Sequence, residues 1–217
     1  MTWVALLLAD PSPCLRALVL RDLLGRPAED PEVRELAPLR DADPLVADLL
    51  ARQAPDGAWS GLGAGAQAGA LLSTALALAR LGYLGYDGGH PAVRRGAEWL
   101  LARQESDGSW PLGAPGDDEG EEAEGYSMRP LQTALPLRGL AACGYATDPR
   151  AERAYDWLLA RRLEDGAWPT GIVAGTYGRV GGYRRLAHSR WGCRSNTTAA
   201  LTCLALHPVR RRGPEAR

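Results

Sequence analysis

One short segment occurs three times along this chain, and it constrains the fold more than any other feature. Residues 50–59 (LARQAPDGAW), 101–110 (LARQESDGSW) and 159–168 (LARRLEDGAW) align without gaps. A match of this length that recurs three times does not arise by chance, so the chain is built from a repeated structural unit.

Each copy of the segment lies at the end of a predicted helix. Residues 91–104 and 149–162 carry apolar side chains at helical spacing, and Pro91 and Pro149 suit a first helical turn. The Asp-Gly pair in each copy predicts that the helix ends at a glycine in the left-handed conformation. We expect the tryptophan that follows to fold back over this turn.

A second, more apolar helix is predicted after each turn, over residues 67–82, 128–144 and 196–207. These ranges are rich in Ala and Leu on nearly all sides, which indicates burial on most faces. Amphipathic outer helices that alternate with apolar inner helices predict an all-α fold. We expect α/α hairpins stacked into a partial α/α toroid, either an open arc or a barrel completed by dimerisation.

The pattern predicts three regions. Residues 1–42 form a degenerate N-terminal capping repeat with helices over 12–24 and 31–39, because terminal repeats are often atypical. Residues 43–208 contain the regular repeats, and residues 209–217 are expected to be a disordered, arginine-rich tail.

Composition excludes several classes of protein. The formal net charge is −1, so no overall field favours nucleic acid, and no apolar stretch is long enough to span a bilayer. The apolar N-terminus lacks the basic flank and cleavage site of a signal peptide, so we expect a cytoplasmic protein. All 25 basic residues are Arg, and Phe is absent, as a GC-rich bacterial coding sequence produces. The four cysteines form no CxxC pair and are expected to be buried thiols.

The triple repeat resembles the Gln-Trp (QW) motif of squalene–hopene and oxidosqualene cyclases, and more broadly the prenyltransferase repeat, over about residues 43–207. The resemblance implies an α/α toroid with an Asp-x-Asp-Asp motif that protonates an alkene or epoxide. The segment offered here is Asp41-Ala42-Asp43-Pro44, which has proline at the fourth position. We favour another interpretation, in which Asp43 caps a helix and Pro44 occupies its first position.

Two long loops of opposite charge follow the second and third turns. Residues 111–126 are rich in acids, and residues 169–194 are rich in arginine and aromatic side chains. We predict a lid over the mouth of the toroid; the alternative is a solvated, disordered acidic loop. The candidate catalytic residues are Asp117, Asp118, Glu119 and His188. The candidate substrate-binding residues are Tyr126, Tyr177, Tyr183, Arg184, Arg185, Arg190 and Trp191.

The sequence predicts no bound cofactor. The alternative is a metal site, zinc or magnesium, that uses His188 and Cys193 together with His207 or Cys143. The Asp, Cys and His zinc ligands of protein prenyltransferases have no clear counterpart in this chain.

Together these features predict a terpenoid-cyclase-like biosynthetic enzyme. It would bind an apolar, isoprenoid-like or polycyclic small molecule in the toroid cavity and transform it by acid–base catalysis. Arginines would hold any anionic head group, and aromatic rings would stabilise carbocations. The alternative is a non-catalytic α-solenoid that binds a peptide or a protein along its concave face. We expect an apolar small molecule and a second copy of the chain as partners, and no nucleic acid.

Overall fold

The computed structural model describes residues 3–62, 69–110, 130–169 and 192–216. Its helices are α1 (Trp3–Leu8), α2 (Pro13–Leu18), α3 (Pro31–Leu36), α4 (Pro44–Ala51), α5 (Ala70–Tyr83), α6 (Pro91–Leu101), α7 (Pro130–Ala142), α8 (Pro149–Leu159) and α9 (Arg194–Leu206). Shorter helical turns are η1 (Val19–Leu23), η2 (Ala37–Ala42), η5 (Arg210–Arg212) and η6 (Pro214–Ala216). The described residues contain no strand, so the predicted all-α fold is confirmed.

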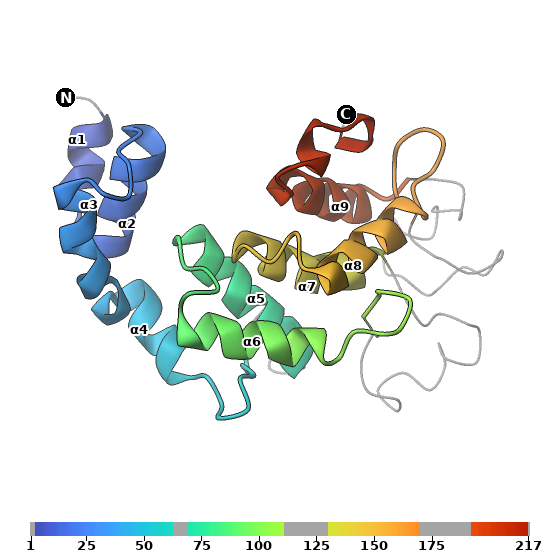
Figure 1. Ribbon diagram of the computed structural model, residues 1–217, viewed down its shortest axis with the longest axis horizontal. Coiled ribbons are helices and arrows are strands. Elements are labelled where there is room, and N and C mark those ends of the chain that lie inside the picture. The colour runs from blue at the N-terminus through green and yellow to red at the C-terminus, as the bar shows by residue number, and fades with distance from the viewer. Residues whose placement is uncertain (1–2, 63–68, 111–129, 170–191, 217) are drawn as a thin grey trace.

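The helices follow an open arc of α/α hairpins (Figure 1). Helices α4, α6 and α8 are the outer helices, and α5, α7 and α9 are the inner ones. Helix α7 lies between α5 and α9 and packs against both. The α5–α7 contact is close because Gly139 has no side chain: a Cβ atom there would lie 2.6 Å from the carbonyl oxygen of Ala75.

The repeat turns confirm the predicted geometry. Gly57, Gly108 and Gly166 have φ angles of 99°, 95° and 87°. In the second turn the Trp110 indole N–H donates to the carbonyl of Leu100 (2.9 Å), and its backbone N–H donates to the Thr133 hydroxyl (3.4 Å). The equivalent groups are Trp59 with Leu49 and Thr74, and Trp168 with Leu158 and Thr197. Each tryptophan therefore joins an outer helix to the inner helix that follows it.

The first two turns also bind the next outer helix. Gln104 Nε2 donates both to Gly108 within its own turn and to the carbonyl of Arg150 at the start of α8, each at 2.9 Å. Asp107 accepts a hydrogen bond from the Trp157 indole of α8 (2.9 Å). The first turn repeats these contacts, with Gln53 and Asp56 bound to Ala92 and Trp99. Consecutive hairpins are thus connected by side-chain groups of the repeat itself.

The third turn differs in the residue that makes this connection. Arg162 stands where the other copies have Gln, and its Nε donates to the carbonyl of Gly166 (3.2 Å). A Cβ atom added to Gly166 would lie 3.0 Å from the Arg162 guanidinium. At the equivalent glycines of the first two turns, an added Cβ atom would instead meet the backbone of the next outer helix. Arg162 therefore covers its own turn.

The N-terminal lobe, formed by α1, α2, η1 and α3, has a small apolar core of its own. Ala17, Leu20, Val33 and Leu36 form this cluster, separate from the main core. The lobe is connected to the repeats by Asp43, which caps α4 through the N–H of Leu45. The predicted cap at Asp43 is therefore confirmed.

Asp43 also binds the lobe, because its second carboxylate oxygen accepts from the Ser12 hydroxyl and from the N–H of Cys14. Burial acts to raise the pKa of this carboxyl, but the hydrogen bonds from Ser12, Cys14 and Leu45 outweigh burial and lower the pKa. A carboxyl whose pKa is lower in the folded chain stabilises the fold above the pKa of the unfolded chain, and this contribution is lost as the pH falls.

We expect Asp43→Asn to lower the free energy of unfolding at pH 7 by about 1.5–3 kcal/mol, because charge-assisted hydrogen bonds to a buried carboxylate are lost. Denaturant unfolding from pH 7 to pH 2 should show the difference from wild type shrinking below about pH 4. The matched control is Asp22→Asn, at an exposed side chain, which should change stability by less than about 0.5 kcal/mol. A difference that persisted unchanged at pH 2 would contradict this role.

In the C-terminal segment, η5 and η6 pack against α9, and Arg210 contacts α8. Arg210 forms ion pairs with Glu152 (2.6 Å) and Asp156 (2.7 Å) of α8. His207 is buried, its Nδ1 accepts from the N–H groups of Val209 and Arg210, and its Nε2 lies 2.8 Å from Glu152. The disorder expected for residues 209–217 stays a prediction, and the acids on α8 are partners that the sequence did not indicate.

The predicted start of the last inner helix also shifts. We expected this helix over residues 196–207, but α9 begins at Arg194 with Cys193 at the cap position. Asn196 is buried and donates from Nδ2 to the carbonyl of Pro169. Among the residues that the structure describes, none of the helices has the length and apolar run needed to cross a membrane.

Candidate functional site

One face of helices α5 and α7 is partly open to solvent, and we call it the inner face. On α5 it consists of side chains at helical spacing, while the residues between them, except Gly82, are buried. The inner face comprises Leu72, Leu76, Arg80 and Tyr83 on α5, and Leu131, Leu135 and Arg138 on α7. Its leucines are not part of the main core, so they are available to an apolar ligand.

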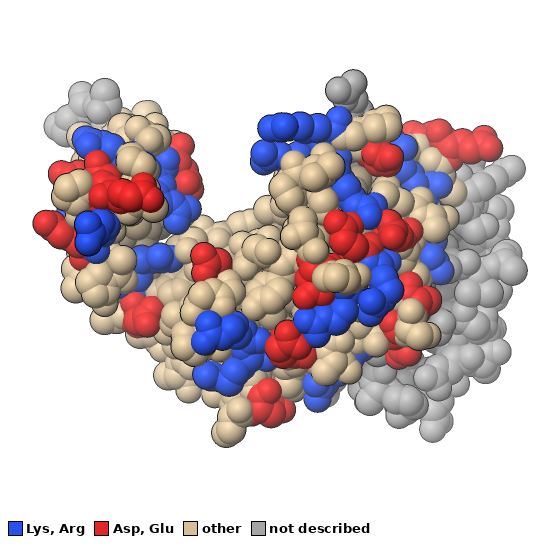
Figure 2. All heavy atoms as spheres, viewed as in Figure 1, with Lys and Arg blue, Asp and Glu red and all other residues tan. Residues whose placement is uncertain are grey.

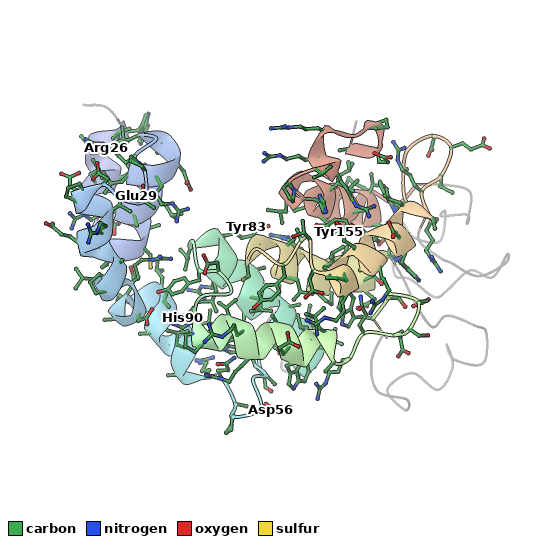
Figure 3. The ribbon with its side chains drawn as sticks, in the orientation of Figure 1. Arg26, Glu29, Asp56, Tyr83, His90 and Tyr155 are labelled. Atoms are coloured by element: carbon green, nitrogen blue, oxygen red, sulfur yellow. The ribbon has the colours of Figure 1, made fainter. Side chains whose placement is uncertain are left out.

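The two helices meet on this face through a polar contact. Arg138 Nε of α7 donates to the Tyr83 hydroxyl of α5 (2.7 Å), and the guanidinium carbon lies 5.1 Å from the centre of the Tyr83 ring. Tyr83 is 41% exposed, and Arg80 lies one helical turn before it and is exposed. Figure 3 places Tyr83 at the floor of a gap between the N-terminal lobe and α9.

This gap is hollowed in the space-filling view (Figure 2), and we call it the notch. One wall is the N-terminal lobe, and the other is α9 with the C-terminal segment 207–216 (Figures 1 and 2). The inner face thus combines an apolar part, formed by leucines, with a cationic and aromatic part that reaches the floor of the notch.

The Asp-x-Asp segment has structural roles in this fold. Asp43 caps α4, as described above. Asp41 accepts a hydrogen bond from the Tyr86 hydroxyl (2.9 Å), and its other oxygen lies 3.3 Å from Nε2 of His90. Burial, followed by the hydrogen bond to Asp41, raises the pKa of Tyr86. The interpretation of this segment as a helix start is therefore confirmed.

The described cysteines are buried, as expected for structural thiols. Cys143 and Cys203 contact the carbonyls of Leu78 (3.1 Å) and Ala134 (3.2 Å), and burial raises the pKa of both thiols to about 12. His207 is engaged with Glu152. Over the described residues, the structure brings no three His, Cys, Asp or Glu side chains into a metal-binding group.

The catalytic and substrate-binding residues predicted from the two long loops fall in residues 111–129 and 170–191, outside the described residues. They are Asp117, Asp118, Glu119 and His188, with Tyr126, Tyr177, Tyr183, Arg184, Arg185, Arg190 and Trp191. Their roles stay predictions. Of the two candidate metal ligands His188 and Cys193, only Cys193 is described, and it is buried at the start of α9.

Sequence reasoning missed Arg80, Tyr83 and Arg138. A signal for them was present, because α5 and α7 each contain one charged residue in an otherwise apolar or neutral helix. A charged side chain in such a helix has to reach solvent or a partner, and it therefore marks the open face.

Comparisons with known proteins agree with the helical repeat. Residues 37–182 match the model of the squalene–hopene cyclase C-terminal domain. The squalene–hopene cyclase of Zymomonas mobilis is 27% identical over 188 residues, which cover 78% of this chain and 26% of the relative. That of Bradyrhizobium diazoefficiens is 30% identical over 156 residues, which cover 64% of this chain and 22% of the relative. The chain thus spans about a quarter of the length of these curated relatives.

Among solved structures, an ent-copalyl diphosphate synthase from Streptomyces platensis aligns with 91% of this chain and 33% of its own, with 22% identity and a TM-score of 0.42. A protein from Actinoplanes aligns with 90% of this chain and 57% of its own, with 25% identity and a TM-score of 0.44. The family match spans all three repeat turns. The chain belongs to the squalene–hopene cyclase C-terminal domain family.

Proposed function

We propose that the protein binds an apolar, isoprenoid-like or polycyclic small molecule along the inner face and transforms it by acid–base catalysis. The observation that carries the proposal is the set of partly exposed leucines on adjacent inner helices, Leu72 and Leu76 on α5 and Leu131 and Leu135 on α7. Covering such side chains with an apolar ligand contributes about 25 cal/mol for each Å² removed from water. Family membership supports a cyclase-like function at this general level.

The proton donor in this proposal comes from outside the inner helices, because α5, α7 and α9 contain no Asp, Glu or His. The predicted donors are Asp117, Asp118, Glu119 and His188. The segments that contain them leave the described structure after Trp110 and Pro169 and return before α7 and α9. Both segments therefore precede the N-terminal end of an inner helix in the chain, and the first precedes the helix that contains Leu131 and Leu135.

Binding is tested by native mass spectrometry and titration of the full chain with farnesol and squalene. We expect Leu76→Gln and Leu135→Gln to weaken binding about tenfold together, because an amide on the inner face loses apolar contact and is desolvated by the ligand. The matched control is Leu39→Gln, at a leucine of η2 that is 51% exposed, which should leave affinity unchanged. The same spectra report whether the protein is a monomer or the predicted homodimer.

Catalysis is tested separately on any isoprenoid that binds. Product formation should fall at least a hundredfold in Asp118→Ala or His188→Ala if these groups transfer the proton. Binding without turnover in wild type would contradict the catalytic half of the proposal. Retention of no isoprenoid, together with capture of one defined partner protein, would favour the non-catalytic solenoid.

A further inference from the structure

The charges on the inner helices are unbalanced, unlike those of the outer helices. Helices α5, α7 and α9 carry Arg80, Arg138 and Arg194 and contain no acidic residue. The outer helices α6 and α8, by contrast, contain acids as well as arginines, and Arg150 pairs there with Glu98 (2.8 Å). Figure 2 shows red and blue side chains interspersed over α6 and α8. The inner helices therefore contain no acid of their own that could neutralise their arginines.

Two of these arginines are close to each other on the inner face. Arg138 is held by the Tyr83 hydroxyl, and Arg80 lies three residues before Tyr83 on the same helix. Within the described part of the chain, neither Arg80 nor Arg138 forms an ion pair. The Tyr83 hydroxyl orients the guanidinium but leaves its charge uncompensated, so a bound anion would be stabilised there.

The C-terminal segment adds positive charge on the same side. Arg211 and Arg212 are exposed, and the basic side chains around η5 project over the notch in Figure 2. Cations on the floor and on one wall of a hollow reinforce one another, because the low-dielectric walls focus their field. The notch is consequently the cationic end of the inner face.

The apolar end lies farther along the same helix. From Arg80 back to Leu72 the rise of α5 is about 12 Å, and Leu76 lies between them on the same face. A ligand that follows this stripe meets leucines at one end and two arginines at the other. Such a surface matches a molecule with an apolar chain and an anionic head, and a neutral hydrocarbon would leave the arginines without a partner.

We infer that the ligand of the inner face is an isoprenoid with a phosphate or diphosphate group, and that Arg80 and Arg138 bind this group at the floor of the notch. The inference rests on the proposed function and specifies its substrate class. Tyr83 is a positioning residue, since it holds Arg138 and does not need to touch the ligand. Arg is suited to the role because its planar guanidinium forms paired hydrogen bonds with phosphate oxygens.

The test compares farnesyl diphosphate, farnesol and inorganic diphosphate by titration calorimetry on the full chain. Wild type should bind farnesyl diphosphate at least tenfold more tightly than farnesol. In the Arg80→Gln/Arg138→Gln double variant this ratio should fall below about threefold, while farnesol affinity is unchanged. The matched control is Arg52→Gln, at the C-terminal cap of the outer helix α4, where the arginine pairs with Asp48 (3.0 Å). It should leave the ratio as in wild type.

A second measurement on wild type does not depend on the variants folding. Raising the salt concentration from 50 to 500 mM should weaken farnesyl diphosphate binding several-fold and leave farnesol binding unchanged, since salt screens partly exposed charges. Equal affinities for the two isoprenoids, or a ratio that survives in the double variant, would overturn the inference. So would inorganic diphosphate that binds as tightly as farnesyl diphosphate, because the apolar chain would then contribute nothing. Binding of neither isoprenoid would reject the proposed function itself.

Discussion

Replacing Trp110 with alanine should lower the free energy of unfolding by about 3–5 kcal/mol, as for other buried aromatic side chains. The side chain is fully buried, and its indole N–H donates to the carbonyl of Leu100 at the end of α6. Removing it leaves a cavity between α6 and α7 and a buried carbonyl without its donor. The effect should be large because the residue connects the two helices of its hairpin.

Two variants separate the components of this loss. Trp110→Phe keeps most of the apolar contact and removes the hydrogen bond, so it should cost roughly half as much as the alanine variant. Trp3→Ala is the matched control, because Trp3 is 81% exposed and should contribute less than about 0.5 kcal/mol. Urea unfolding followed by circular dichroism measures all three. A Trp110→Ala cost no larger than that of Trp3→Ala would show that the turn does not hold the array together.

The repeat made the architecture predictable because its information is local. Asp-Gly predicts where a helix ends, Pro and Asp predict where one begins, and the tryptophan needs only its own hairpin to be buried. The contact of Asp107 with Trp157 was not predicted, although Asp107 lies in the repeated segment and Trp157 just before its third copy. It joins residues far apart in the chain, and local patterns do not specify which outer helix a turn will meet.

The contacts that were not predicted have the same physical origin. The partners of Arg210 are Glu152 and Asp156 on α8, which lie far from it in the sequence. Arg80 and Arg138 were overlooked because the loops have the denser charge pattern. These arginines indicate an anion site because the neighbouring helices α5, α7 and α9 contain no acid. That α7 packs between α5 and α9 is known only from the structure.

The docking of one hairpin on the next depends on a glycine, and this gives the second large effect. Gly108 has a φ of 95°, and a Cβ atom there would lie 2.6 Å from the carbonyl oxygen of Arg153 in α8. Gly144 has a similar φ of 87°, but a Cβ atom there would meet nothing within 4 Å. The two positions share the left-handed backbone and differ only in the close approach of the neighbouring helix.

Gly108→Ala should therefore lower the free energy of unfolding by about 3–4 kcal/mol, and Gly144→Ala by about 1 kcal/mol, the usual cost of a left-handed alanine. The additional loss arises because α8 has to move away from the turn, which breaks the hydrogen bonds of Gln104 and Asp107 to α8. Gly166→Ala should resemble Gly144→Ala, since the atom nearest to its Cβ belongs to the flexible side chain of Arg162.

Urea unfolding of the three glycine variants tests this order. Equal losses at positions 108 and 144 would mean that backbone strain alone makes these glycines necessary. The predicted order would instead show that the first two turns require glycine because a helix packs directly against them. It would also explain how the third turn can accept an arginine at position 162, since its glycine meets a side chain and no second backbone.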